Sequence, residues 1–133
     1  MKKIKILWVD DDGNFGPGVH LRYEDDLKEI GIELVNPKHH LILKSGEYVY
    51  ETVRTHEPDL IMMDHNLEDV KINGGNLVVG IRLINNEIPI IYYSSEMNSD
   101  LMKLVEDENN VTSMQRTEVE SSFFTLIKKY IKK

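Results

Sequence analysis

Short apolar runs alternate with amphipathic stretches along the chain. The apolar runs lie at 4–9, 32–35, 60–63, 88–93 and 111–114. Runs of this length, rich in β-branched and aromatic residues, predict strands. The first, third and fourth runs are almost wholly apolar, which is typical of strands that a sheet buries on both faces. The pattern therefore predicts five strands, of which three are fully buried.

Between these runs, apolar residues recur at the spacing of a helix. Helices are predicted around 23–30, 49–56, 77–84 and 101–105, and a last one over 117–131. Gly31 ends the first helix, and Pro58 ends the second because the residue before a proline avoids helical dihedrals. Thr117 and Glu120 fit a capping box that opens the last helix. The segment 38–44 fits either an extension of the second strand or a loop.

The alternation of five strands with five helices determines the predicted fold class. Strand–helix–strand units connect parallel strands, and their helices cover both faces of the sheet. We therefore expect a doubly wound α/β fold with a five-stranded parallel sheet. The 133 residues fit one domain of ordinary size, and no repeat or linker divides them, so 1–133 is predicted to be a single domain.

Composition narrows the classes of function. The chain has 16 Lys and Arg residues against 23 Asp and Glu, and its net charge of −7 disfavours direct binding to nucleic acid or to anionic membranes. It has no cysteine, which excludes disulfides, thiol nucleophiles and thiolate metal sites. No apolar run approaches the length of a membrane span or of an export signal. We therefore expect a cytoplasmic protein.

Three of the apolar runs end in acidic or hydroxyl side chains. In chain order these are Asp10, Asp11 and Asp12, then Asp64, then Ser94 and Ser95. Function in doubly wound sheets lies at the carboxyl ends of the strands. If these strands are neighbours, their carboxylates repel one another, and a hard divalent cation such as Mg²⁺ relieves that repulsion. A carboxylate beside Mg²⁺, with a hydroxyl nearby, is suited to phosphoryl transfer.

The three segments together resemble a known signalling family. They read Leu-Trp-Val-Asp-Asp-Asp at 7–12, Leu-Ile-Met-Met-Asp at 60–64 and Pro-Ile-Ile-Tyr-Tyr-Ser-Ser at 89–95. In order and spacing they are similar to the receiver domain of bacterial two-component response regulators. The resemblance covers nearly the whole chain. It implies a flavodoxin-like sheet with strand order 2-1-3-4-5 and a stand-alone receiver of the chemotaxis-regulator kind.

The resemblance implies a role for each matching residue. Asp64 would be the phosphoacceptor, and Ser94 would contact the phosphoryl group through its hydroxyl. Mg²⁺ would be held by the side chains of Asp10, Asp11 and Asp64, with Asp11 the more direct ligand of the acidic pair. The backbone carbonyl of Asn66 would complete this set.

The chain also departs from the family pattern. The family's fifth strand ends in a lysine followed by a proline, and that lysine binds the phosphoryl group. Here the region contains neither, and Gln115 or Arg116 is the nearest candidate to replace the lysine. The loop after Asp64 lacks the usual proline, and Gly74 or Gly75 matches the glycine that follows it. We therefore expect phosphorylation combined with an atypical switch.

The resemblance also implies the partners. The phosphoryl donor would be a histidine kinase or a phosphotransfer protein, and a downstream protein would bind the surface of the fourth helix, fifth strand and fifth helix. Such a receiver is a signalling acceptor with slow loss of its own phosphoryl group, not a turnover enzyme. The sequence leaves the oligomeric state open.

Two alternative functions stay open at this stage. The sequence Asp10-Asp11-Asp12-Gly13 also resembles the nucleophile motif of haloacid dehalogenase-type phosphatases, in which Asp10 would be the nucleophile and Asp12 the general acid. That family places its last acidic ligands after the hydroxyl residue, whereas Asp64 precedes Ser94. The other alternative is a pseudo-receiver, a binding module that is not phosphorylated, which the missing lysine would allow.

Overall fold

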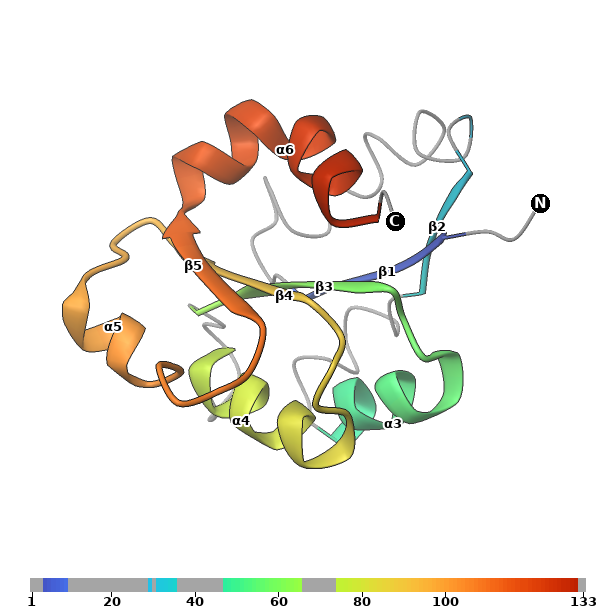
Figure 1. Cartoon of the computed structure of the whole chain (residues 1–133), viewed down its shortest axis with the longest axis horizontal. Helices are drawn as coiled ribbons and strands as arrows, with labels where there is room; N and C mark the ends of the chain where they lie inside the picture. Colours follow the sequence, from blue (N-terminus) through green and yellow to red (C-terminus); the bar gives the residue numbers. More distant parts are fainter. Residues whose placement is uncertain (1–3, 10–28, 30, 36–46, 66–73, 132–133) are drawn as a thin grey trace.

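A single parallel sheet organises the chain. The computed structural model describes residues 4–9, 29, 31–35, 47–65 and 74–131. Within them, five strands pair in the order β2-β1-β3-β4-β5, all parallel (Figure 1). They are β1 (Ile4–Val9), β2 (Ile32–Leu34), β3 (Leu60–Asp64), β4 (Ile90–Ser94) and β5 (Val111–Gln115). This order confirms the predicted fold class.

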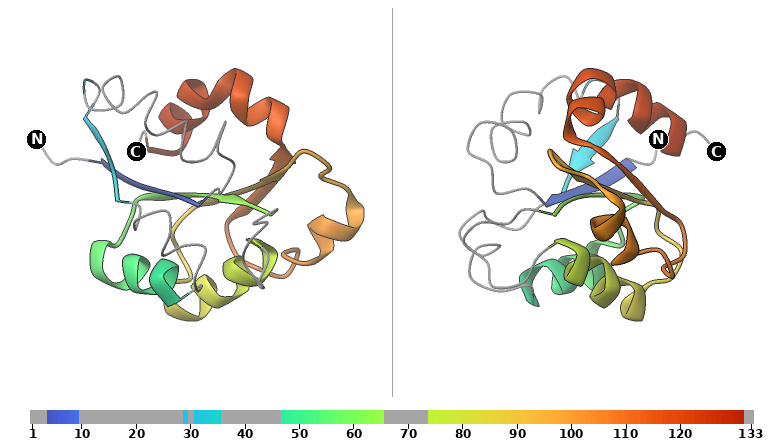
Figure 2. Two further views of the ribbon diagram at one scale, coloured as in Figure 1. Left: turned by 180° about the vertical axis from the view of Figure 1, so that it is seen from behind. Right: turned by 90° about the vertical axis from the view of Figure 1, so that its left-hand side faces the viewer.

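Helices cover both faces of the sheet. Those with assigned bounds are α3 (Glu47–His56), α4 (Gly74–Ile84), α5 (Ser99–Lys103) and α6 (Arg116–Ile131). The helix α6 lies on one face, and α3 and α4 lie on the other (Figures 1 and 2). The predicted helix at 23–30 and the segment 38–44 fall almost entirely outside the described residues. No helix in the described ranges is both long and apolar enough to span a membrane.

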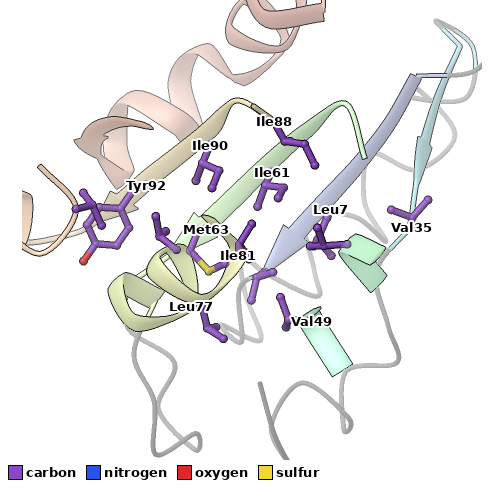
Figure 3. Close-up of a cluster of buried hydrophobic side chains, with 14 of the residues drawn as sticks. Leu7, Val35, Val49, Ile61, Met63, Leu77, Ile81, Ile88, Ile90 and Tyr92 are labelled. Carbon is purple, nitrogen blue, oxygen red and sulfur yellow. The ribbon is translucent and has the colours of Figure 1, made fainter. Parts of the chain in front are cut away.

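The main apolar core lies between the sheet and the helices α3 and α4 (Figure 3). Strand residues such as Leu7 and Ile61 meet helix residues such as Val49 and Ile81, and all four are fully buried. Alternate side chains of each strand point to this face, as the period of a strand requires. Burial of this apolar surface holds the three central strands in place and so fixes where their ends lie.

The strand β4 begins later than the predicted run at 88–93. Ile88 donates its N–H to the side-chain oxygen of Asn85 at 3.1 Å, and its carbonyl accepts from Arg82 Nη2 at 2.5 Å. Pro89 has no N–H to donate to a neighbouring strand. The turn before β4 therefore uses the polar groups of Ile88, and the strand starts at Ile90.

The predicted capping box of the last helix is wrong. The helix α6 begins at Arg116, directly after β5, so Thr117 is already inside it. The N–H of Gln115 donates to the carboxylate of Glu118 at 3.4 Å, which places the acidic half of the cap two residues before Glu120. The helix starts earlier than predicted because β5 ends at Gln115 and α6 follows directly, with no loop between them. The Thr117–Glu120 pattern does not indicate where the strand ends.

Candidate functional site

The strand β3 ends in a buried carboxylate. The Asp64 side chain is 2% exposed, and the residue lies beside Tyr93 of β4 in the strand register. The N–H of His65 donates to the carbonyl of Tyr93 at 2.9 Å. The hydrogen bonds between β3 and β4 thus continue one residue past Asp64, and the bond from His65 fixes the position of the Asp64 backbone.

The start of α4 lies against the backbone of Asp64. The N–H of Gly74 donates to the carbonyl of His65 at 3.0 Å. A Cβ atom at Gly74 would overlap the carbonyl oxygen of Asp64 and crowd the Cα of His65. Only glycine permits this approach, so Gly74, one of the two predicted glycines, lies directly against the backbone of Asp64.

Arg116 reaches Asp64 from the first residue of α6. Its Nη2 donates to Oδ2 of Asp64 at 3.1 Å, and the Arg116 side chain is 12% exposed. The Cζ of Arg116 also lies 5.5 Å from the centroid of the Tyr93 ring. A carboxylate removed from water is costly unless an opposite charge compensates it. Arg116 supplies that charge.

The Gln115 side chain bonds the backbone of Met97. Its Nε2 donates to the carbonyl of Met97 at 2.6 Å, and its Oε1 accepts from the N–H of Met97 at 3.2 Å. These two bonds tie the end of β5 to the segment between β4 and α5. Of the two candidates to replace the lysine, the structure therefore places Arg116 against Asp64 and Gln115 against Met97.

Ser94 ends β4 at the same edge of the sheet. It lies one residue beyond the Tyr93–Asp64 pair in the register and is completely buried. Its Oγ accepts a hydrogen bond from the N–H of Glu96 at 3.1 Å. The hydroxyl predicted to contact a phosphoryl group thus lies on the strand next to β3 and supports the turn that follows β4.

Three of the four positions predicted to hold Mg²⁺ lie outside the described residues: Asp10, Asp11 and Asn66. The fourth, Asp64, is described. Val9 at the end of β1 pairs with Met63, the residue before Asp64. Among the described residues, no group of three His, Cys, Asp or Glu side chains is placed to hold a metal ion. The one described member of the predicted set, the buried Asp64 carboxylate at the end of β3, offers oxygen ligands of the kind that Mg²⁺ prefers.

A tyrosine–histidine pair lies next to Asp64. The Tyr92 hydroxyl hydrogen-bonds His65 Nδ1 at 2.5 Å, with the two rings edge-on at 5.8 Å between centroids. Burial, together with the nearby negative charge of Asp64, raises the pKa of Tyr92 to about 12. Burial also lowers the pKa of His65, which favours the neutral imidazole. A neutral imidazole carries its proton on one of its two nitrogens, so the tautomer of His65 sets which partner donates in this bond.

Sequence reasoning missed a second aromatic contact. Trp8 Nε1 donates to the Tyr93 hydroxyl at 2.8 Å, and the two side chains are 1% and 0% exposed. β3 runs between their two strands, so the contact spans the strand that carries Asp64. The available signal was chemical, because a buried indole N–H or phenol normally has a hydrogen-bond partner.

The surface predicted for a downstream partner comprises α5, β5 and α6. Met102 on α5 is 46% exposed, and Leu104, the residue that follows this helix, is 44% exposed. A depression of about 390 Å³ lies between α5 and β5, lined in part by Met102, Lys103, Glu106 and Val111. This part of the surface therefore presents apolar and charged side chains together.

Solved structures of receiver domains share this fold. A CheY-like receiver domain protein from Methanospirillum hungatei matches with a TM-score of 0.74 at 13% identity, over 96% of this chain and 93% of the other. Chemotaxis protein CheY4 of Vibrio cholerae matches at 0.73 and 14% identity, over 97% and 99%. The receiver domain of sensor histidine kinase PA1611 from Pseudomonas aeruginosa, with magnesium coordinated in its active site cleft, matches at 0.70 and 18% identity, over 98% and 99%.

These matches confirm the resemblance at the level of the fold. No protein-family profile matches the chain, and no curated protein matches its sequence. The likeness therefore lies in how the strands and helices are arranged. The chain has the fold of response-regulator receiver domains.

Proposed function

We propose that this protein is a phosphorelay receiver in which Asp64 accepts a phosphoryl group in a Mg²⁺-dependent reaction. The observation that carries the proposal is the buried Asp64 carboxylate at the carboxyl end of β3, with Arg116 Nη2 3.1 Å from its Oδ2. Doubly wound sheets bind ligands at this edge. The receiver-domain fold of the matching structures supports the same function.

The proposed chemistry is transfer of a phosphoryl group from a phosphohistidine. An oxygen of Asp64 forms a bond to phosphorus as the phosphorus–nitrogen bond of the donor breaks, and the departing imidazole keeps or takes up a proton. The product is an acyl phosphate with more negative charge than the carboxylate. Because a guanidinium binds phosphoryl oxygens as well as carboxylates, Arg116 can serve the site before and after transfer.

Mg²⁺ and Ser94 complete the proposed site. The ion would be held by the side chains of Asp64, Asp10 and Asp11 and by the carbonyl of Asn66. When bound, Mg²⁺ offsets the negative charge of the phosphoryl oxygens. Ser94 Oγ accepts a hydrogen bond from the backbone N–H of Glu96. A serine hydroxyl can also donate, and in the phosphorylated state the Ser94 hydroxyl would donate to a phosphoryl oxygen.

The partners are part of the proposal. A cytoplasmic histidine kinase or phosphotransfer protein would donate the phosphoryl group. A downstream protein would bind the surface of α5, β5 and α6, where Met102 and Leu104 are exposed. Because the acyl phosphate is the signal, the protein would act stoichiometrically, with slow hydrolysis of its own phosphoryl group and no turnover of a substrate.

Intact-mass measurement with a small acyl-phosphate donor and Mg²⁺ tests the acceptor. We expect the wild type to gain one phosphoryl group and Asp64→Asn to gain none, because the amide cannot form the acyl phosphate. Asp100→Asn is the matched control, since it removes an exposed carboxylate on α5 with the same change of charge. This variant should be phosphorylated like the wild type.

Other results would replace the proposal. A wild type that gains no phosphoryl group, with or without Mg²⁺, would favour the pseudo-receiver. Steady phosphate release that survives Asp64→Asn but is lost in Asp10→Asn would favour the phosphatase.

A further inference from the structure

We propose that Tyr93 is a positioning residue that holds the Arg116 guanidinium over Asp64, and that Trp8 holds Tyr93 in turn. This inference rests on the proposed phosphoryl-acceptor function of Asp64. It addresses a question that the missing lysine raises: how the longer side chain and planar head of an arginine are kept in place beside Asp64.

The contacts form a continuous path on the α6 side of the sheet. Asp64 and Tyr93 are partners in the register of β3 and β4, so their side chains leave the sheet on the same face. The Arg116 guanidinium contacts both, at 3.1 Å from Nη2 to Asp64 Oδ2 and 5.5 Å from Cζ to the Tyr93 ring centroid. The Tyr93 ring therefore lies beside the ion pair.

The chemistry of the guanidinium explains why an aromatic ring suits this place. An arginine head is planar and weakly hydrated, and it stacks on aromatic rings in a way that does not use up its N–H donors. A fully buried ring also keeps water away from the ion pair, which strengthens the attraction between its charges. Tyr93 thus restricts where the head can lie without competing for the donors that bind Asp64.

Trp8 extends the path to β1. Its Nε1 donates to the Tyr93 hydroxyl at 2.8 Å across β3, and the indole is 1% exposed. The bond fixes the far end of the tyrosine ring, whose face contacts Arg116. Because Trp8 is the sole tryptophan of the chain, its fluorescence reports directly on this arrangement.

The test compares phosphorylation rates of purified variants with an acyl-phosphate donor and Mg²⁺. We expect Tyr93→Leu to be phosphorylated about tenfold more slowly, in line with the loss of a desolvated cation–π contact. Tyr93→Phe keeps the ring and loses the hydroxyl, so it should be slowed about threefold and change the Trp8 fluorescence. Ile91→Ala is the matched control, because Ile91 is fully buried on the same face of β4 and lies two residues from Tyr93. It should keep the wild-type rate.

A double-mutant cycle separates positioning from packing. In an Arg116→Gln background, Tyr93→Leu should cause no further slowing, because the ring then has no guanidinium to hold. If Arg116→Gln is too slow to compare, the same cycle is read from urea unfolding, where the two substitutions should be non-additive.

Each outcome decides the inference. Equal slowing by Tyr93→Leu with and without Arg116, or additive effects on unfolding, would show that Tyr93 only packs. A wild-type rate for Tyr93→Leu would overturn the positioning role and leave the acceptor function standing. Failure of the wild type to be phosphorylated would remove both the function and this role.

Discussion

At the scale of single residues, the site depends on one long-range ion pair. Arg116 lies 52 positions beyond Asp64 in the chain, and the fold brings Nη2 and Oδ2 to 3.1 Å. A lysine would offer a compact, strongly hydrated charge, whereas arginine offers a planar group that can contact a carboxylate and a ring at once. The Tyr93 ring beside the guanidinium is consistent with that difference. The structure therefore places an aromatic ring as well as a cation beside the Asp64 carboxylate.

His65 makes the stability of the fold depend on pH. Burial lowers its pKa below the ordinary value of 6.5, so the unfolded chain takes up this proton first as the pH falls. The free energy of unfolding should therefore decrease as the pH drops through 6.5 toward the lowered pKa. We expect His65→Asn to lose less stability than the wild type between about pH 7.5 and about pH 5.5. Urea unfolding in the presence of a metal chelator measures this difference.

His56→Asn is the control for the histidine prediction. His56 is exposed at the end of α3, so its replacement removes an imidazole that the fold does not bury. This variant should show the same pH dependence as the wild type. Equal pH dependence in His65→Asn and the wild type would mean that His65 does not contribute.

At the scale of elements, the helix α4 is held close to the acceptor strand by its first glycine. The helix begins where Gly74 meets the backbone of Asp64, and it packs against α3 further along. Gly80 makes a second close approach, since a Cβ there would overlap the hydroxyl of Tyr50. The two glycines thus face different neighbours, one a rigid strand end and the other a half-buried side chain.

This difference predicts unequal effects of the same substitution. Gly74→Ala should reduce the free energy of unfolding by about 2 kcal/mol and slow phosphorylation of Asp64, because strand backbone cannot yield to the added methyl. Gly80→Ala should change stability by less than about 1 kcal/mol, since Tyr50 can rotate and alanine favours the helix. Chemical unfolding and phosphorylation rates of the two variants check this. Equal effects at the two positions would contradict the close approach of α4 to Asp64.

At the scale of the whole molecule, the two ends of the sheet differ: one carries the candidate site, and the other carries a set of hydrogen bonds that join two turns. Asp64 and Ser94 lie at the carboxyl ends of their strands. At the opposite end, the buried side chain of Arg82 joins the turn before β4 to the turn before β5. It donates to the carbonyls of Asn85, Ile88, Asn109 and Asn110, at distances from 2.5 to 3.3 Å. Burial lowers the pKa of Arg82, and Glu108 opposes this shift.

Arg82 should therefore contribute to stability without contributing to the site. We expect Arg82→Met to lower the free energy of unfolding by about 3 kcal/mol, because it leaves several carbonyls without their charged donor. Phosphorylation of the folded protein at Asp64 should be unchanged. Lys103→Met is the control, as Lys103 is exposed on α5 and its loss should change stability by less than about 0.5 kcal/mol. Loss of phosphorylation by folded Arg82→Met would show that the two ends are coupled.

The strands, most of the described helices and the fold class could be predicted from the pattern of apolar residues alone. Apolar periodicity reflects which faces are buried, and burial is the main driving force of folding. The pattern also placed Asp64 and Ser94 at strand ends, because an apolar run stops where the chain leaves the core. Asp10 and Asp11 follow the first run in the same way, although they lie outside the described residues.

Which side chains contact one another could not be predicted in this way and depends on the folded chain. The choice between Arg116 and Gln115, the start of α6 at Arg116, and the contact of Trp8 with Tyr93 all depend on how β5 and β1 lie relative to β3. Local patterns record burial and turns, but they carry no distance between segments far apart in the chain. These contacts therefore follow from the order and register of the strands, which the sheet establishes as a whole.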